Sequence, residues 1–144
     1  MANKRNQITA EFANLIKNNL NGESPYTSNL FDNVKDKQIF WDEVTDYPTV
    51  CVYPGSEVRE YHPGAFKWAF LTVNVRIYVQ DEDAKERLEE IFNDIENLLD
   101  DNNQLTVGGN NLSVDIRLQS ITDDEGTLHP QGVGEMTFEV RYEV

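Results

Sequence analysis

The residues that could do metal or nucleophilic chemistry are few and scattered along the chain. One cysteine, Cys51, and two histidines, His62 and His129, occur in 144 residues. Zinc sites draw on clustered His, Cys, Asp and Glu side chains at fixed spacing. A joint site would require the acidic residues beside each histidine to meet in space. We therefore expect two ordinary loop histidines, no metal site and no cofactor.

Two acidic runs offer oxygen ligands for cations. Residues 81–83 resemble the start of a calcium loop, but Glu86 stands where the sixth position of that loop requires glycine. We predict instead that Asp83 caps a helix, with Glu86 at the spacing of a capping box. Residues 123–126 are expected to form a solvated acidic turn.

Sequence motifs for catalysis are missing. The chain contains neither a nucleophile elbow nor a phosphate-binding loop that ends in Gly-Lys-Ser or Gly-Lys-Thr. A hydrolase that uses two carboxylates stays open as an alternative, because 26 acidic residues always include close pairs. Nothing singles one pair out, so we predict a protein that is not an enzyme and has no catalytic residues.

Composition predicts a folded, acidic domain over residues 1–144. Hydrophobic residues make up 39% of the chain and charged residues 26%, which permits a packed core. The net charge of −14 repels phosphate backbones and argues against direct DNA recognition. No apolar stretch approaches the roughly 20 residues of a membrane span, and residues 1–7 lack the apolar segment of a signal peptide. We expect a cytoplasmic protein without a membrane partner, in which Cys51 is buried.

Hydrophobic spacing predicts two helices. Residues 8–20 and 84–99 repeat apolar side chains every three or four positions, the period of an amphipathic helix. Residues 1–7 are expected to form a flexible arm before the first helix. The apolar stripe of the second helix consists of Ala84, Leu88, Ile91, Phe92, Ile95, Leu98 and Leu99.

Alternating apolar residues predict strands. In the clearest, residues 68–79, one face holds Ala69, Leu71, Val73, Val75, Ile77 and Val79. Weaker signals cover residues 39–44, 49–53, 57–61, 105–107, 112–118 and 136–144, with turns at residues 54–55 and 108–111. Long loops are predicted at residues 22–38, 54–67 and 119–135. This order predicts an α+β domain in which two helices pack on one face of a mainly antiparallel sheet.

Aromatic residues in the predicted loops are the positive functional signal. Two loop segments, residues 53–68 and 121–133, combine rings with Pro and Gly turns. Rings that have little reason to be buried in their own domain are typical of protein interfaces. The alternative is that the rings pack back on their own sheet. We predict an interface that consists of Tyr61, His62, Phe66, Lys67, Trp68, Leu128 and His129.

Several stretches resemble the tail-terminator proteins of long-tailed bacteriophages. They are Phe40-Trp41-Asp42-Glu43-Val44, Tyr47-Pro48-Thr49-Val50-Cys51-Val52, Tyr53-Pro54-Gly55-Ser56-Glu57 and Phe66-Lys67-Trp68. The acidic helix after Val79 and the closing stretch 123–135 are also similar. The resemblance covers about residues 8–144 and is one of order and local composition.

This resemblance implies an α+β subunit of a six-membered ring that sits on the last ring of the tail tube. Such a ring stops tube growth, offers a surface to the head connector or neck protein and, in contractile tails, touches the sheath. DNA would pass through the lumen without specific binding, past acidic residues of the helix 83–100 or the strand 137–143. The protein would belong to the virion tail or neck and occupy the host cytoplasm during assembly, with residues 55–67 and 121–135 contacting other subunits or the tube.

Two other classes of protein stay open from the sequence. A neck stopper, a head-completion protein or a tail-tube protein would share the logic of ring assembly. A non-viral protein-binding module would be a monomer or dimer in solution. Electron microscopy of the purified chain separates rings from long tubes, and sedimentation separates either from a small module.

Overall fold

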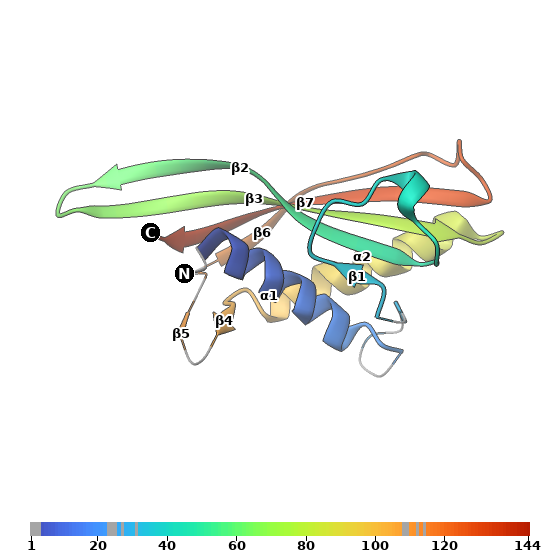
Figure 1. Ribbon diagram of the computed structural model, residues 1–144, viewed down its shortest axis with the longest axis horizontal. Coiled ribbons are helices and arrows are strands. Elements are labelled where there is room, and N and C mark those ends of the chain that lie inside the picture. Colours follow the sequence, from blue (N-terminus) through green and yellow to red (C-terminus); the bar gives the residue numbers. More distant parts are fainter. Residues whose placement is uncertain are drawn as a thin grey trace.

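Long strands and two helices build the fold. The computed structural model describes residues 4–22, 26, 28–30, 32–107, 110–111, 113 and 115–144. In this part of the chain, α1 (Lys4–Asn19) and α2 (Ala84–Asp101) lie on the same side of the main sheet (Figure 1). The sheet has the order β1 (Val34–Lys35), β2 (Thr49–His62), β3 (Phe66–Gln80), β7 (Gln131–Glu143) and β6 (Asp115–Asp123). β1 runs parallel to β2, and the other neighbours are antiparallel, which confirms the predicted α+β class.

The alternation predicted for the long strand is confirmed in β3. Its odd-numbered residues from Ala69 to Val79 are buried against the helices, whereas Thr72, Asn74 and Arg76 are half-buried on the opposite face. The register pairs Val52 with Val75 and Val75 with Met136, so three strands contribute apolar side chains to one layer. The opposite face, called the open face below, carries the polar residues.

Both helices bury their predicted apolar stripes in this layer. α1 buries Ile8, Phe12 and Ile16, and the Phe12 ring meets Phe138 of β7 edge-on, with 5.2 Å between the centroids. Each large side chain removed from water contributes about 1.5–3 kcal/mol, so the helices are held by packing. The stripe of α2 is buried at every predicted position: Ala84, Leu88, Ile91, Phe92, Ile95, Leu98 and Leu99.

The first helix is longer than predicted. α1 begins at Lys4, so residues 4–7 of the expected flexible arm are helical; residues 1–3 lie outside the described part. Two side-chain hydrogen bonds tie this first turn to the sheet. The Lys4 ammonium donates to the Glu143 carbonyl at 2.7 Å, and the Arg5 guanidinium donates to the Gly55 carbonyl at 3.0 Å.

The prediction of a long loop at residues 54–67 is wrong, because this segment forms most of a β-hairpin. β2 continues through Pro54 and Gly55, where a register shift between Pro54 and Glu57 replaces the expected turn. Proline is tolerated at a bulge or on an edge strand, where no ladder hydrogen bond from its nitrogen is needed. The chain reverses instead at residues 63–65, where Gly64 and Ala65 have φ of 85° and 63°.

Other predicted boundaries also shift. β6 and β7 pair as far as Asp123 and Gly134, so the loop expected at 119–135 shrinks to residues 124–130. The strand expected at 39–44 is absent; η1 (Trp41–Glu43) is a 3-10 helix, and Ile39 packs with Cys51 and Tyr78 on the open face.

In the loop expected at 22–38, the described residues include the short strand β1, whereas residues 23–25, 27 and 31 lie outside the described part. The strand expected at 105–107 corresponds to β4 (Thr106–Val107), which pairs with β5 (Asn110–Asn111). Residues 108–109 of the expected turn, and residues 112 and 114, also lie outside the described part.

The predicted capping box at the start of α2 does not form. Asp83 occupies the cap position, but its side chain makes no capping hydrogen bond. The carboxylate of Asp81 accepts the Asp83 N–H at 2.9 Å instead. The acidic run therefore does organise the helix start, but through Asp81, which lies two residues before the predicted cap Asp83.

A close approach between α2 and β7 depends on Gly134. A Cβ at this position would lie 2.7 Å from Cε1 of Phe92 and closer still to its Cζ. We expect Gly134→Ala to lower the free energy of unfolding by about 1–3 kcal/mol, because overpacking forces side chains and backbone to shift. Urea unfolding measures this, and Gly134→Ala combined with Phe92→Leu should lose less than the sum of the single changes. Strict additivity would show that the two residues do not meet.

Candidate interface surfaces

Residues 57–68 form a projecting hairpin, called the hairpin arm below. They comprise the end of β2, the turn and the start of β3, and the pairing runs from Glu57 with Leu71 to His62 with Phe66. β7 pairs with β3 only as far as Trp68, so the tip of the arm extends past the end of the neighbouring strand. Figure 1 shows the arm at one extreme of the long axis of the molecule.

Five of the seven predicted interface residues come together on this arm. Tyr61 is 71% exposed, and the Lys67 ammonium lies 4.8 Å from the centre of its ring. Phe66 links the remaining rings: its centroid lies 5.5 Å from that of His62 and 5.0 Å from that of Trp68. Phe66 and Trp68 are half-buried, so the interpretation that the rings pack on their own sheet holds for them in part.

The arm presents different side chains on its two faces. Phe66 and Trp68 alternate with Lys67 along β3 and so project to the open face, where Arg141 of β7 lies 4.9 Å from the Trp68 ring. Lys67 and Tyr61 are register partners on the face that bears the helices. The arm therefore offers stacked rings on one side and a tyrosine with a cation on the other.

A buried carboxylate braces the base of the arm. The Glu57 side chain is 8% exposed and lies 2.7 Å from Arg59 Nε and 3.6 Å from Arg5 Nε. The Tyr142 hydroxyl donates to the same carboxylate. These contacts join α1, β2 and β7 at one point at the base of the arm, called the Glu57 brace below.

Removal of the Glu57 carboxylate is expected to destabilise the fold. Glu57→Ala leaves the buried Tyr142 hydroxyl without its acceptor and removes the carboxylate beside Arg5 and Arg59, which lowers the free energy of unfolding by about 1–3 kcal/mol. Glu57→Gln keeps an acceptor for the hydroxyl and should lose less. Glu60→Ala is the matched control, since the Glu60 side chain is 56% exposed on the same strand. Equal losses for Glu57→Ala and Glu60→Ala in urea unfolding would contradict the brace.

The pKa of Tyr142 is raised from its ordinary value near 10 to about 12. Burial is the largest cause, and the hydrogen bond to Glu57 and the negative charge of that carboxylate act in the same direction. A pKa that is higher in the folded state favours the protonated, neutral hydroxyl. Its stabilising contribution is therefore complete below about pH 10 and is lost as the pH rises towards 12. We expect the unfolding free energy of the wild type to fall more steeply than that of Tyr142→Phe across this window. Parallel curves for the two proteins would argue against a shifted tyrosine.

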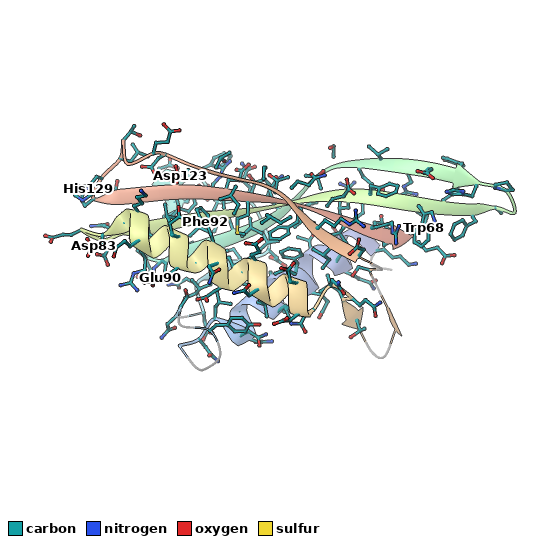
Figure 2. The ribbon with its side chains drawn as sticks, turned by 180° about the vertical axis from the view of Figure 1, so that it is seen from behind. Trp68, Asp83, Glu90, Phe92, Asp123 and His129 are labelled. Atoms are coloured by element: carbon teal, nitrogen blue, oxygen red, sulfur yellow. The ribbon has the colours of Figure 1, made fainter. Side chains whose placement is uncertain are left out.

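The remaining two predicted interface residues lie at the opposite end of the molecule. Leu128 and His129 belong to the turn between β6 and β7, and Figure 2 places His129 and Asp123 far from Trp68. The Asp124 carboxylate shapes this turn by accepting the Leu128 N–H at 3.1 Å. The structure thus separates the predicted residues into two surfaces.

A shallow groove, called the end groove below, lies on the open face at this second end. Phe40 and Leu128 flank it, Tyr78 and Val133 line it, and Asp123 and Asp124 add carboxylates. Its volume is about 530 Å³. The Tyr78 hydroxyl donates to the Ile39 carbonyl at 2.7 Å, which holds the segment containing Phe40 against the sheet.

The sequence interpretation missed several exposed apolar residues of both surfaces. Five of the six large hydrophobic side chains that are exposed in the described ranges lie towards the two ends of the sheet: Val58, Tyr61 and Val144 at the arm end, and Phe40 and Leu128 at the groove end. The sixth, Ile121 of β6, pairs with Met136 near the middle of the sheet. Val58 and Phe40 fell in predicted strands, where nothing in the local sequence distinguished an exposed residue from a core residue.

The structure offers no metal site within its described residues, where no three His, Cys, Asp or Glu side chains are grouped to hold an ion. His62 pairs with Glu60, with 2.8 Å between Nε2 and Oε1, at the end of the molecule opposite to His129. Cys51 is fully buried. Neither described helix combines the length and apolar composition that a bilayer crossing requires.

Sequence comparisons identify the family. The model of the bacteriophage tail tube terminator protein family matches residues 2–144. The chain is also 31% identical over 150 residues to the tail tube terminator protein p142 of Escherichia phage T5, across 96% of this chain and 93% of that protein. The chain therefore belongs to the bacteriophage tail tube terminator family, as a structural protein of the virion tail that caps the tail tube and is not an enzyme.

Proposed function

We propose that six copies of this protein, each a single domain over residues 1–144, close into a ring on the end of the tail tube. Such a ring ends tail polymerisation and provides the surface to which the head connector or neck protein joins. One observation carries the proposal: the domain has two unlike exposed surfaces at opposite ends of one sheet. Contacts between unlike surfaces are head-to-tail, and they close into a ring when the repeated rotation returns to its start.

The length of the sheet suits this arrangement. β3 contains 15 residues, and an extended strand of that length spans about 50 Å at roughly 3.3 Å per residue. Because β3 pairs with β2 and β7 along most of its course, the two ends are joined by a continuous hydrogen-bonded sheet. Each subunit would then act as a stiff spacer between its two neighbours.

The two layers of the domain support a ring with two different faces. One layer is formed by the helices, and the other is the open face of the sheet with polar rows such as Thr72, Glu139 and Arg117. A ring whose faces differ binds the tube with one face only. The other face offers no equivalent site for a further tube ring, so growth stops there and head joining takes its place.

The charge distribution supports passage of DNA through the lumen without specific binding. α2 exposes Glu86, Glu89, Glu90 and Asp100, and Arg87 beside them is paired with Asp81 and Glu90. The row of β7 side chains on the open face is less acidic, because Arg141 lies between Glu139 and Glu143. Lys85 is also exposed on α2, but the acidic residues outnumber it. α2 is therefore the better lining for the lumen, since a predominantly negative wall repels a passing duplex.

Assembly would take place in the host cytoplasm before the ring becomes part of the neck of the virion. In a contractile tail, the outer rim of the ring would also meet the sheath. The test is to add the purified protein to tubes that are growing from tail-tube subunits and to image them in negative stain. We expect tubes that carry a ring at one end, stop lengthening and join to heads. Tubes that keep growing at an unchanged rate with folded protein present would contradict the proposal.

A further inference from the structure

We propose that the hairpin arm of one copy docks in the end groove of the next copy, an assignment that rests on the proposed ring. The arm is a narrow two-stranded projection, and the end groove is an open depression that Phe40 and Leu128 flank. They lie at opposite ends of the same chain, so every copy carries one of each (Figure 2).

The exposed apolar side chains support this pairing. Val58 and Tyr61 of the arm are 65% and 71% exposed, and Phe40 and Leu128 of the groove are 56% and 43% exposed. In the rest of the described chain, large hydrophobic side chains are buried or half-buried, apart from Val144, which lies at the arm end, and Ile121, which lies nearer the middle of the sheet. Contact between the two ends would bury both patches together.

Charge selects the arm as the partner of the groove. Residues 57–68 contain two acidic and two basic side chains, whereas residues 121–135 contain Asp123, Asp124, Glu125 and Glu135 without any lysine or arginine. Arg76 of β3 also lines the groove, but it pairs with Glu135 at 2.8 Å, so Asp123, Asp124 and Glu125 keep this end negative and two groove ends would repel each other. Lys67 is half-buried, and its ammonium, which lies 4.8 Å from the centre of the Tyr61 ring, supplies a cation that can pair with the Asp123 and Asp124 carboxylates.

The Glu57 brace prepares the arm for docking. Arg5, Arg59 and Tyr142 hold the base of the arm in one direction before any contact is made. A surface that is already ordered loses little conformational freedom on binding. A second copy is the favoured occupant because both complementary surfaces belong to this chain. The tube protein is the rival occupant, and the experiment below separates the two.

Thiol cross-linking tests the pairing. In a Cys51→Ala background, Tyr61→Cys chains are mixed with Leu128→Cys chains and treated with a short bismaleimide. We expect this mixture to form cross-linked dimers about ten-fold faster than a control mixture in which Lys17→Cys chains replace the Tyr61→Cys chains. Docking would raise the effective concentration of the two thiols only in the first mixture. Lys17 is exposed on α1 and lies in neither surface. Circular dichroism verifies that each variant is folded.

A charge swap provides the second measurement. Lys67→Glu and Asp123→Lys should each lower the yield of dimers several-fold, and chains that carry the two changes on opposite partners should recover it. Cross-linking at the control rate, or capture of Tyr61→Cys by the tube protein alone, would overturn the inference. If the arm-to-groove pairing is overturned but the protein still caps growing tubes, the proposed function stands without the pairing. If the cross-linked dimers form but the tubes keep growing, the pairing stands and the proposed function fails.

Discussion

Replacement of Val75 by aspartate is expected to unfold the domain. Val75 is fully buried at the middle of β3, and its register partners Val52 and Met136 are also fully buried. An unpaired carboxylate there would have only apolar neighbours across the strands. Leaving a buried charge uncompensated costs about 3–5 kcal/mol, a large part of the roughly 5–15 kcal/mol that stabilises a typical domain.

Circular dichroism and urea unfolding measure this effect. Asn74→Asp is the matched control, because the adjacent Asn74 is half-buried on the open face and the change keeps its shape. We expect this control to retain a cooperative unfolding transition within about 1 kcal/mol of the wild type. A folded Val75→Asp protein would show that β3 does not face the helices as described.

Truncation of the rings on the hairpin arm should have the largest effect on assembly. Phe66 and Trp68 lie edge to face at 5.0 Å, and Arg141 covers Trp68. Aromatic anchors at interfaces contribute about 2 kcal/mol or more each, so Phe66→Ala or Trp68→Ala should weaken binding to neighbours or to the tube about 30-fold. The domain should stay folded, because its core lies on the other side of the sheet.

Sedimentation velocity of the purified protein and the capping of growing tubes both report this loss. Trp68→Phe keeps a ring beside Phe66 and should retain most of the binding, which separates the effect of the ring from that of any change at the position. Lys17→Ala on α1 is the control for an exposed change elsewhere. Unchanged capping by folded Phe66→Ala and Trp68→Ala proteins would remove the arm from the interface.

The elements that the sequence predicts best are those whose pattern depends on a single face. β3 and α2 each bury one regular stripe, so a period of two residues or of three to four residues identifies them. The hairpin arm was missed because Pro54 and Gly55 read as a turn. Its strand conformation depends instead on pairing with β3 and on a bulge that only the partner strand reveals.

The strand predicted at residues 39–44 was wrong for a related reason. Their aromatic and β-branched side chains favour a strand, but Ile39 and Val44 pack on the open face around Cys51 and Tyr78 without joining the sheet. The grouping of Tyr61, His62, Phe66, Lys67 and Trp68 followed from their closeness in sequence. The sequence did not predict that Leu128 and His129 lie at the other end of the molecule, because their position depends on the order and length of strands that pair over long range.

Membership of the tail tube terminator family resolves the identity that the residues alone left open. The match over residues 2–144 sets aside a tube protein, a neck stopper and a non-viral binding module. What the fold adds is the proposed physical basis for capping: unlike exposed surfaces at the two ends of one sheet, and a helix layer that differs in charge and polarity from the open face.

A cryo-electron-microscopy map of tails capped by this protein would test that basis most directly. We expect a closed ring in which the projecting hairpin of every subunit lies against the Phe40 and Leu128 side of its neighbour, with α2 towards the lumen. A map in which these hairpins touch no other chain, or in which the cap is a single subunit, would contradict it.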